Sequence, residues 1–172
     1  MGVAPSGPIG VIIRPHASSM SIEESQPGRP TLVLLVEDSP DHAELVQRSL
    51  ADHRMQSRIV HLTDGQQALD YLLRRGAWSD PASSPRPQLI LLDLRLPRVD
   101  GLEVLDRIKA EPGVRSIPVV VLTTSDADRD VARAYDRHAN SYLVKPVDFH
   151  QFRKLMEDLG LYWLHWNRQQ GH

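Results

Sequence analysis

The sequence contains no cysteine, which excludes a disulfide framework and fits a protein of the reducing cytoplasm. No apolar run approaches the roughly 20 residues that cross a bilayer, and the first residues lack the pattern of a signal peptide. A block of Lys and Arg is also absent, and the formal net charge is −2. We therefore expect a cytoplasmic protein that binds neither membranes nor nucleic acids.

Composition changes along the 172 residues. Residues 1–30 are rich in Pro, Gly and Ser, and such a segment buries too little apolar surface to offset its ordering entropy. We expect a disordered extension there, with Met20 as an alternative natural start. The chain as a whole is 41% hydrophobic, which supports one ordinary core in the remainder.

Strands and helices are predicted to alternate five times after residue 30. Short apolar runs predict strands at 32–36, 58–62, 89–92, 117–122 and 141–144. Possible N-caps at Ser39, Asp64 and Asp148, together with apolar residues at helical spacing, predict helices after the successive strands. Short, right-handed connections favour a parallel sheet with helices on both faces.

Polar side chains follow four of these strands directly. Glu37 and Asp38 follow the first strand, Asp93 the third, Thr123 the fourth and Lys145 the fifth. Open α/β sheets bind their ligands beyond these carboxyl ends. Three carboxylates gathered there would repel one another, and a divalent cation that prefers oxygen ligands, such as Mg²⁺, would relieve the repulsion.

Each of these residues also has a simpler interpretation. An aspartate after a strand usually forms a turn, and Asp38 could cap the helix that begins at Ser39-Pro40. Lys145 alone would be a solvated lysine, and Tyr142 would be a half-buried aromatic residue on an edge strand. The occurrence of the whole set in one order favours a shared site.

The set Glu37-Asp38, Asp93, Thr123 and Lys145-Pro146, with the segment D-L-R-L-P-R-V-D-G, resembles the receiver domain of two-component response regulators. The resemblance covers residues 31–160. It implies a flavodoxin-like (CheY-like) doubly wound α/β fold, with a five-stranded parallel sheet in the order 2-1-3-4-5 and five helices. It also implies a signalling protein, not an enzyme, that accepts a phosphoryl group from a histidine kinase.

The resemblance assigns the phosphoryl chemistry residue by residue. It implies that Asp93 is the phosphoacceptor and that Thr123 and Lys145 contact the phosphoryl group. It further implies a switch in which Tyr142 swings inward when the hydroxyl of Thr123 engages that group.

The resemblance also implies a magnesium site. Asp38 and Asp93 would bind Mg²⁺ directly, together with the backbone carbonyl of Arg95, and Glu37 would hold a metal-bound water. In the same family a glycine is usual where His138 stands, so the turn before the last strand is open to question.

Other segments resemble one subgroup more closely. The loop 76–87, the run V-V-V-L-T-T-S and the aromatic finish L-Y-W-L-H-W-N are similar to stand-alone response regulators that pair with bacterial phytochrome kinases. This implies red-light signalling and a homodimer. Residues 161–172 would extend the last helix, with Trp163 and Trp166 at the interface; alternatively, this tail packs on its own domain.

Two other classes of function remain to be weighed. One is an interaction module of the same fold that does not use phosphorylation, which the intact acid, Thr and Lys set argues against. The other is a phosphatase with an aspartyl nucleophile, which would place a second aspartate two residues after the first. Arg95 stands at that position and disfavours it.

Overall fold

The computed structural model describes residues 31–51, 57–124, 128–146 and 148–160. The predicted extension 1–30 and the predicted tail 161–172, with Trp163 and Trp166, lie outside these residues.

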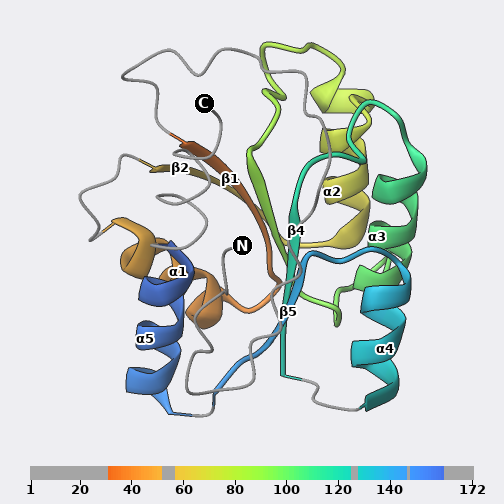
Figure 1. The fold of residues 1–172 in the computed structure, drawn as a ribbon. Coiled ribbons are helices and arrows are strands. Elements are labelled where there is room, and N and C mark those ends of the chain that lie inside the picture. The colour runs from red at the N-terminus through yellow and green to blue at the C-terminus, as the bar shows by residue number, and fades with distance from the viewer. Residues whose placement is uncertain (1–30, 52–56, 125–127, 147, 161–172) are drawn as a thin grey trace, which may run out of the picture.

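Five strands alternate with five helices in the described chain, and one loop contains a short 3-10 helix (Figure 1). The strands are β1 (Thr31–Val36), β2 (Ser57–Leu62), β3 (Leu89–Leu92), β4 (Val119–Thr123) and β5 (Ser141–Val144). The helices are α1 (Pro40–Ala51), α2 (Gly65–Leu72), η1 (Gly76–Trp78), α3 (Gly101–Ala110), α4 (Asp128–Asp136) and α5 (Phe149–Gly160).

All five strands run parallel in the order β2-β1-β3-β4-β5, which confirms the predicted flavodoxin-like α/β fold. Figure 1 shows α1 and α5 on one side of the sheet and α2, α3 and α4 on the other. The strands β1, β3 and β4 lie between other strands and are covered on both faces, so every residue in them is buried, and all but Thr31 and Thr123 are apolar.

The core is therefore divided by the sheet into two layers. Successive strand residues point to opposite faces, so Val33 and Leu35 pack with α1 and α5, while Leu34 and Val36 pack with α2 and α3. The α1–α5 layer is completed by side chains from both helices, namely Ala43, Val46, Leu50, Phe152, Met156 and Leu159.

The predicted helix starts are confirmed at two aspartates. Asp64 and Asp148 each accept, through Oδ1, a hydrogen bond from the backbone N–H three residues later, at 2.8 and 3.0 Å. The predicted start of β4 was two residues too early. The N–H of Ile117 donates to the carbonyl of Val114 at 3.0 Å in the preceding turn, and Pro118 has no N–H to give to the sheet.

The turn between α4 and β5 keeps a left-handed residue without using glycine. His138 adopts φ +64°, and its N–H donates to the carbonyl of Tyr135 at 2.9 Å. A side chain in this conformation costs roughly 1–2 kcal/mol relative to a right-handed one. The departure from glycine therefore costs some stability but leaves the turn in place.

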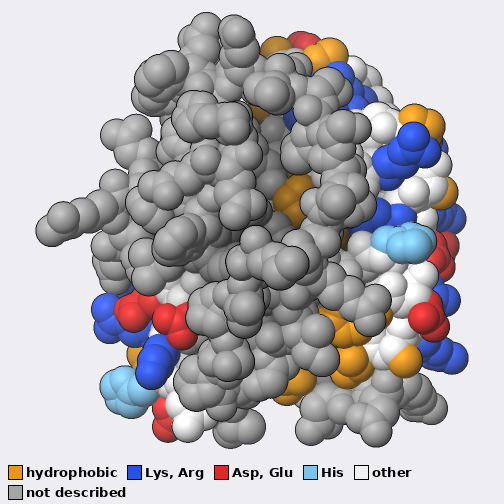
Figure 2. Space-filling model, viewed as in Figure 1, with side chains coloured by type: hydrophobic (Ala, Val, Ile, Leu, Met, Phe, Trp, Pro, Cys, Tyr) orange, Lys and Arg blue, Asp and Glu red, His pale blue; other side chains and the backbone are white. Residues whose placement is uncertain are grey.

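Charged side chains of both signs are interspersed on the described surface visible in Figure 2, as the small net charge leads one to expect. A group of hydrophobic side chains lies low on the same face. Among the described helices, none combines the length and apolar character that crossing a membrane requires.

The loop after β3 folds back so closely that it requires a glycine at its end. The N–H of Gly101 donates to the carbonyl of Leu94 at 2.8 Å, and a Cβ on Gly101 would lie 2.2 Å from the carbonyl oxygen of Asp93. The close backbone approach, not an unusual φ, is the reason that glycine is needed here. This contact places the start of α3 directly against Asp93.

We expect Gly101→Ala to lower the free energy of unfolding by about 2 kcal/mol or more, because overpacking against backbone cannot be relieved by a side-chain rotation. Gly113→Ala is the matched control. Its Cβ would meet only the end of the Arg86 side chain, at 3.7 Å, so we expect no loss of stability. Urea unfolding of both variants gives the answer, and equal stability of the two would show that the loop relaxes without cost.

Candidate functional site

The carboxyl ends of β1, β3, β4 and β5 lie side by side, and the backbone pairing extends one residue beyond several of them. The N–H of Asp93 donates to the carbonyl of Val36 at 3.0 Å, and the N–H of Lys145 donates to the carbonyl of Thr123 at 2.7 Å. The site residues are therefore held by the sheet itself. This brings together residues that are up to 108 positions apart in the sequence.

Three carboxylates meet at this edge. Glu37, Asp38 and Asp93 each offer an oxygen within 4.8 Å of the others. Asp38 is exposed, whereas Glu37 and Asp93 are 1% and 7% exposed. The predicted cluster of acids therefore exists, with one member open to solvent and two inside.

Lys145 is the counter-charge of the buried pair. Its Nζ donates to Oε2 of Glu37 in a short contact and to Oδ2 of Asp93 at 3.1 Å, and the Lys145 side chain is 2% exposed. The alternative of a solvated lysine at a strand end is thus wrong. Breaking such a buried ion pair from one side leaves a charge without its partner.

The negative charge of the buried Glu37 carboxylate is only partly compensated by its neighbours. Burial raises the pKa of Glu37 to about 7, the charge of Asp93 adds to this, and the hydrogen bond and charge of Lys145 oppose it. The backbone N–H of Ser39 also donates to Oε1 of Glu37, at 3.1 Å. One lysine and one N–H do not compensate for the burial of this acid beside another, so the site favours an additional positive charge.

The acidic cluster fits a divalent cation. Its donors are all carboxylate oxygens, which Mg²⁺ and Mn²⁺ accept, and their spacing lets several of them contact one ion. With their ordinary charges, the three acids and Lys145 sum to −2, which one divalent ion would balance. Asp38, the exposed member, offers its oxygens from the solvent side.

Asp93 has both carboxylate oxygens engaged. Oδ1 accepts from the backbone N–H of Arg95 at 3.1 Å, while Oδ2 accepts from Lys145. The Arg95 side chain itself is exposed. A simple turn-forming aspartate would accept the local N–H but would not be buried against a lysine, so the turn interpretation covers only half of its contacts.

Thr123 and Tyr142 lie on the same face of the sheet. Val121 is in register with Tyr142 and Thr123 with Val144, and alternation puts Thr123 on the face of Val121. Thr123 is fully buried and Tyr142 is 5% exposed, within the layer that contains α2, α3 and α4. The ring is thus more deeply buried than the half-buried edge aromatic of the simpler interpretation.

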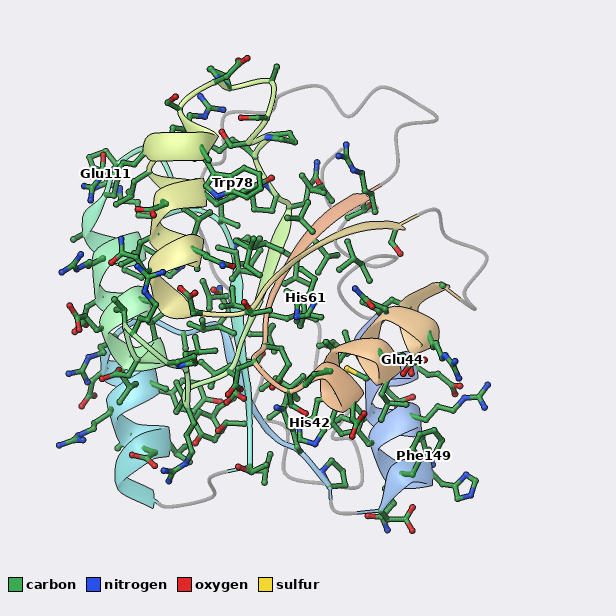
Figure 3. The ribbon with its side chains drawn as sticks, turned by 180° about the vertical axis from the view of Figure 1, so that it is seen from behind. His42, Glu44, His61, Trp78, Glu111 and Phe149 are labelled. Atoms are coloured by element: carbon green, nitrogen blue, oxygen red, sulfur yellow. The ribbon has the colours of Figure 1, made fainter. Side chains whose placement is uncertain are left out.

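Two histidines that the sequence did not single out also reach the site. Nδ1 of His42, in the first turn of α1, lies 3.2 Å from Nζ of Lys145, and Nε2 of His61 in β2 lies 2.8 Å from the carbonyl oxygen of Glu37 (Figure 3). The helix start at Ser39-Pro40 could have indicated His42, since it puts residue 42 in the first turn beside the strand ends.

Comparison with known proteins identifies the family. The family described as the response regulator receiver domain matches residues 33–157. The "Probable methanogenesis regulatory protein FilR2" of Methanothrix harundinacea is 48% identical over 83% of this chain and 89% of that protein. "Response regulator Rcp1" of Synechocystis sp. is 42% identical over 83% of this chain and 93% of that protein.

Solved structures agree in fold over the same region. The phosphorylated cyanobacterial phytochrome response regulator RcpA is 38% identical, with a TM-score of 0.76 over 80% of this chain and 96% of that one. The Mn²⁺-bound form of Rcp1 is 42% identical, also with a TM-score of 0.76, over 79% of this chain and 96% of that one.

Proposed function

This chain belongs to the response regulator receiver family, and we propose that it acts in two-component signalling by accepting a phosphoryl group on the carboxylate of Asp93. The observation that supports this most directly is the burial of Asp93 against Lys145, at 3.1 Å, beside two further acids. An acidic group that only shaped a turn would have no need of this environment.

The proposed transfer assigns a role to each of these groups. A carboxylate oxygen of Asp93 attacks the phosphorus of a phosphohistidine, the P–N bond breaks, and the imidazole nitrogen of the donor keeps the bonding electrons and takes up a proton. Lys145, which donates to Oδ2 of Asp93, can then donate to an oxygen of the phosphoryl group on Asp93. Its positive charge offsets the negative charge of that group. Thr123, at the end of the adjacent strand, supplies the hydroxyl donor in this proposal.

Mg²⁺ is the cation that we propose for the acidic cluster. Asp38 and Asp93 would bind it directly with the backbone carbonyl of Arg95, and Glu37 would hold one of its waters. When bound, the ion neutralises negative charge on the carboxylates and on the transferring phosphoryl oxygens. The excess of negative charge around Glu37 supports a divalent ion at this position, and the similar protein Rcp1 has been solved in a Mn²⁺-bound form.

The output of this reaction is a change of conformation, not a released product. An aspartyl-nucleophile phosphatase would need a second acid two residues after Asp93, where Arg95 points its side chain to solvent. We therefore propose that the protein promotes only its own phosphorylation and dephosphorylation. A phosphorylation-independent module would not need the buried Lys145 between two acids.

The phosphodonor partner is a histidine kinase, as membership of this family implies, and we propose a phytochrome kinase in particular. RcpA is a phytochrome response regulator by name, and it and Rcp1 are both covered nearly end to end. The relative FilR2 is named as a regulator of methanogenesis, so a kinase with another input is the second candidate. A phytochrome kinase encoded beside this chain would favour the first.

We expect the wild-type protein to gain one phosphoryl group with Mg²⁺ and acetyl phosphate, and Asp93→Asn to gain none, because the amide is not a nucleophile. Asp100→Asn is the matched control, since this exposed aspartate lies in the same loop and asparagine caps a helix equally well. Intact mass measures the result. Full phosphorylation of Asp93→Asn would disprove the assignment.

Phosphorylation should also change the environment of Tyr142, if this ring and Thr123 form the switch that we propose. We expect the Tyr142 ring signals to shift in NMR spectra when the phosphoryl analogue beryllofluoride is added with Mg²⁺. In Thr123→Ala the analogue should bind but the Tyr142 shift should be smaller, because the hydroxyl that senses the phosphoryl group is gone. An equal Tyr142 shift in the wild type and in Thr123→Ala would show that Tyr142 does not respond through the Thr123 hydroxyl.

We also propose a homodimer built from α4, α5 and the tail, with Trp163 and Trp166 at its centre. Loss of one buried interface tryptophan commonly costs about 2 kcal/mol or more, roughly a thirtyfold change in the dissociation constant. We expect Trp163→Ala to be monomeric in analytical ultracentrifugation at micromolar concentration. Trp78→Ala is the control, since Trp78 packs on Tyr71 within its own domain; a monomeric wild type would refute the proposal.

A further inference from the structure

His42 completes the set of acceptors around Lys145. The ammonium of a lysine has three hydrogens to donate, and Nζ has three acceptors in the structure: Oε2 of Glu37, Oδ2 of Asp93 and Nδ1 of His42, the last at 3.2 Å. Because a lysine can only donate, Nδ1 of His42 must accept, which puts the ring proton on Nε2.

The His42 ring is held in place from a different helix. It stacks on the ring of Phe152 in α5, with 5.9 Å between the centroids and 23° between the planes. Phe152 is buried in the layer between α1, α5 and the sheet, whereas the His42 side chain is 39% exposed. His42 is therefore the more exposed partner of this contact, whereas the side chain of Lys145 is almost fully buried.

The three acceptors differ in what else they can bind. Glu37 and Asp93 belong to the acidic cluster, and in the proposed function their oxygens would also contact the cation and the incoming phosphoryl group. His42 lies outside that cluster and carries no charge when it accepts. It is thus the acceptor that remains available to Lys145 when the carboxylates take other partners.

We propose that His42 is a positioning residue for phosphorylation: its Nδ1 holds the ammonium of Lys145 aimed at Asp93, and Phe152 holds the His42 ring. This inference rests on the proposed function of Asp93 as the phosphoacceptor. The phosphoryl oxygen takes the place of Oδ2 as an acceptor of Lys145, and His42 keeps the remaining hydrogen occupied. Without this third acceptor, the ammonium of Lys145 could adopt more orientations and would donate less often to the phosphoryl group on Asp93.

The test is the affinity for beryllofluoride at saturating Mg²⁺, measured by fluorescence titration. A hydrogen bond from a charged donor is strong enough that its loss weakens binding by roughly tenfold, so we expect that change in His42→Ala. We expect His42→Asn to bind close to wild type, because the amide Oδ1 can accept where Nδ1 did. His150→Ala removes an exposed histidine of α5 that contacts Phe149, and should bind normally.

A double-mutant cycle separates positioning from general structure. In a Lys145→Ala background, His42→Ala should cause no further loss of beryllofluoride affinity, because the lysine that it positions is absent. A second tenfold loss would overturn the proposal. Equal affinity of wild type and His42→Ala would overturn it too, while leaving the function of Asp93 intact.

A measurement without metal or phosphoryl analogue tests the contact itself. With ¹⁵N-labelled histidine, we expect the Nδ1 resonance of His42 to move towards that of a free acceptor nitrogen in Lys145→Ala, with the resonances of His150 unchanged. No movement would overturn the inference. A wild type that neither binds beryllofluoride nor gains phosphate would instead overturn the proposed function, and the inference with it.

Discussion

The attachment of Lys145 to two buried acids is the interaction on which the site depends. Its ammonium lies between Glu37 after β1 and Asp93 after β3, while its own backbone is bonded to Thr123 at the end of β4. Four strands are thus joined at one edge by charge as well as by the sheet. Removing the lysine would leave two acids facing each other with no cation between them, which is costly away from water.

The fold leaves an excess of negative charge at this edge of the sheet. Burial raises the pKa of Glu37 to about 7 even though Lys145 donates to it, so the site gains from any further positive charge. An excess of negative charge attracts a divalent cation, which is the ligand that we propose for this site. Rigid strands fix the acids, and the apolar layers on both faces of the sheet keep them from moving apart.

The contacts of the site reach both layers of the core. Thr123 and Tyr142 lie on the face covered by α2, α3 and α4, whereas His42 and Phe152 connect Lys145 to the face covered by α1 and α5. Through Lys145, the site around Asp93 is therefore connected to residues on both sides of the sheet. The relatives RcpA and Rcp1 share this fold over almost their whole length, so the same layering is available to them.

Periodicity and the order of polar residues in the sequence were sufficient to predict the α/β fold class, the helix caps at Asp64 and Asp148, and the acids at the strand ends. These features are local, since strand runs, caps and strand-end residues are set by their immediate neighbours. The contact of His42 with Lys145 needs two segments about a hundred residues apart. Only the packed sheet decides such contacts, because burial and distance between remote segments have no signal in a local pattern.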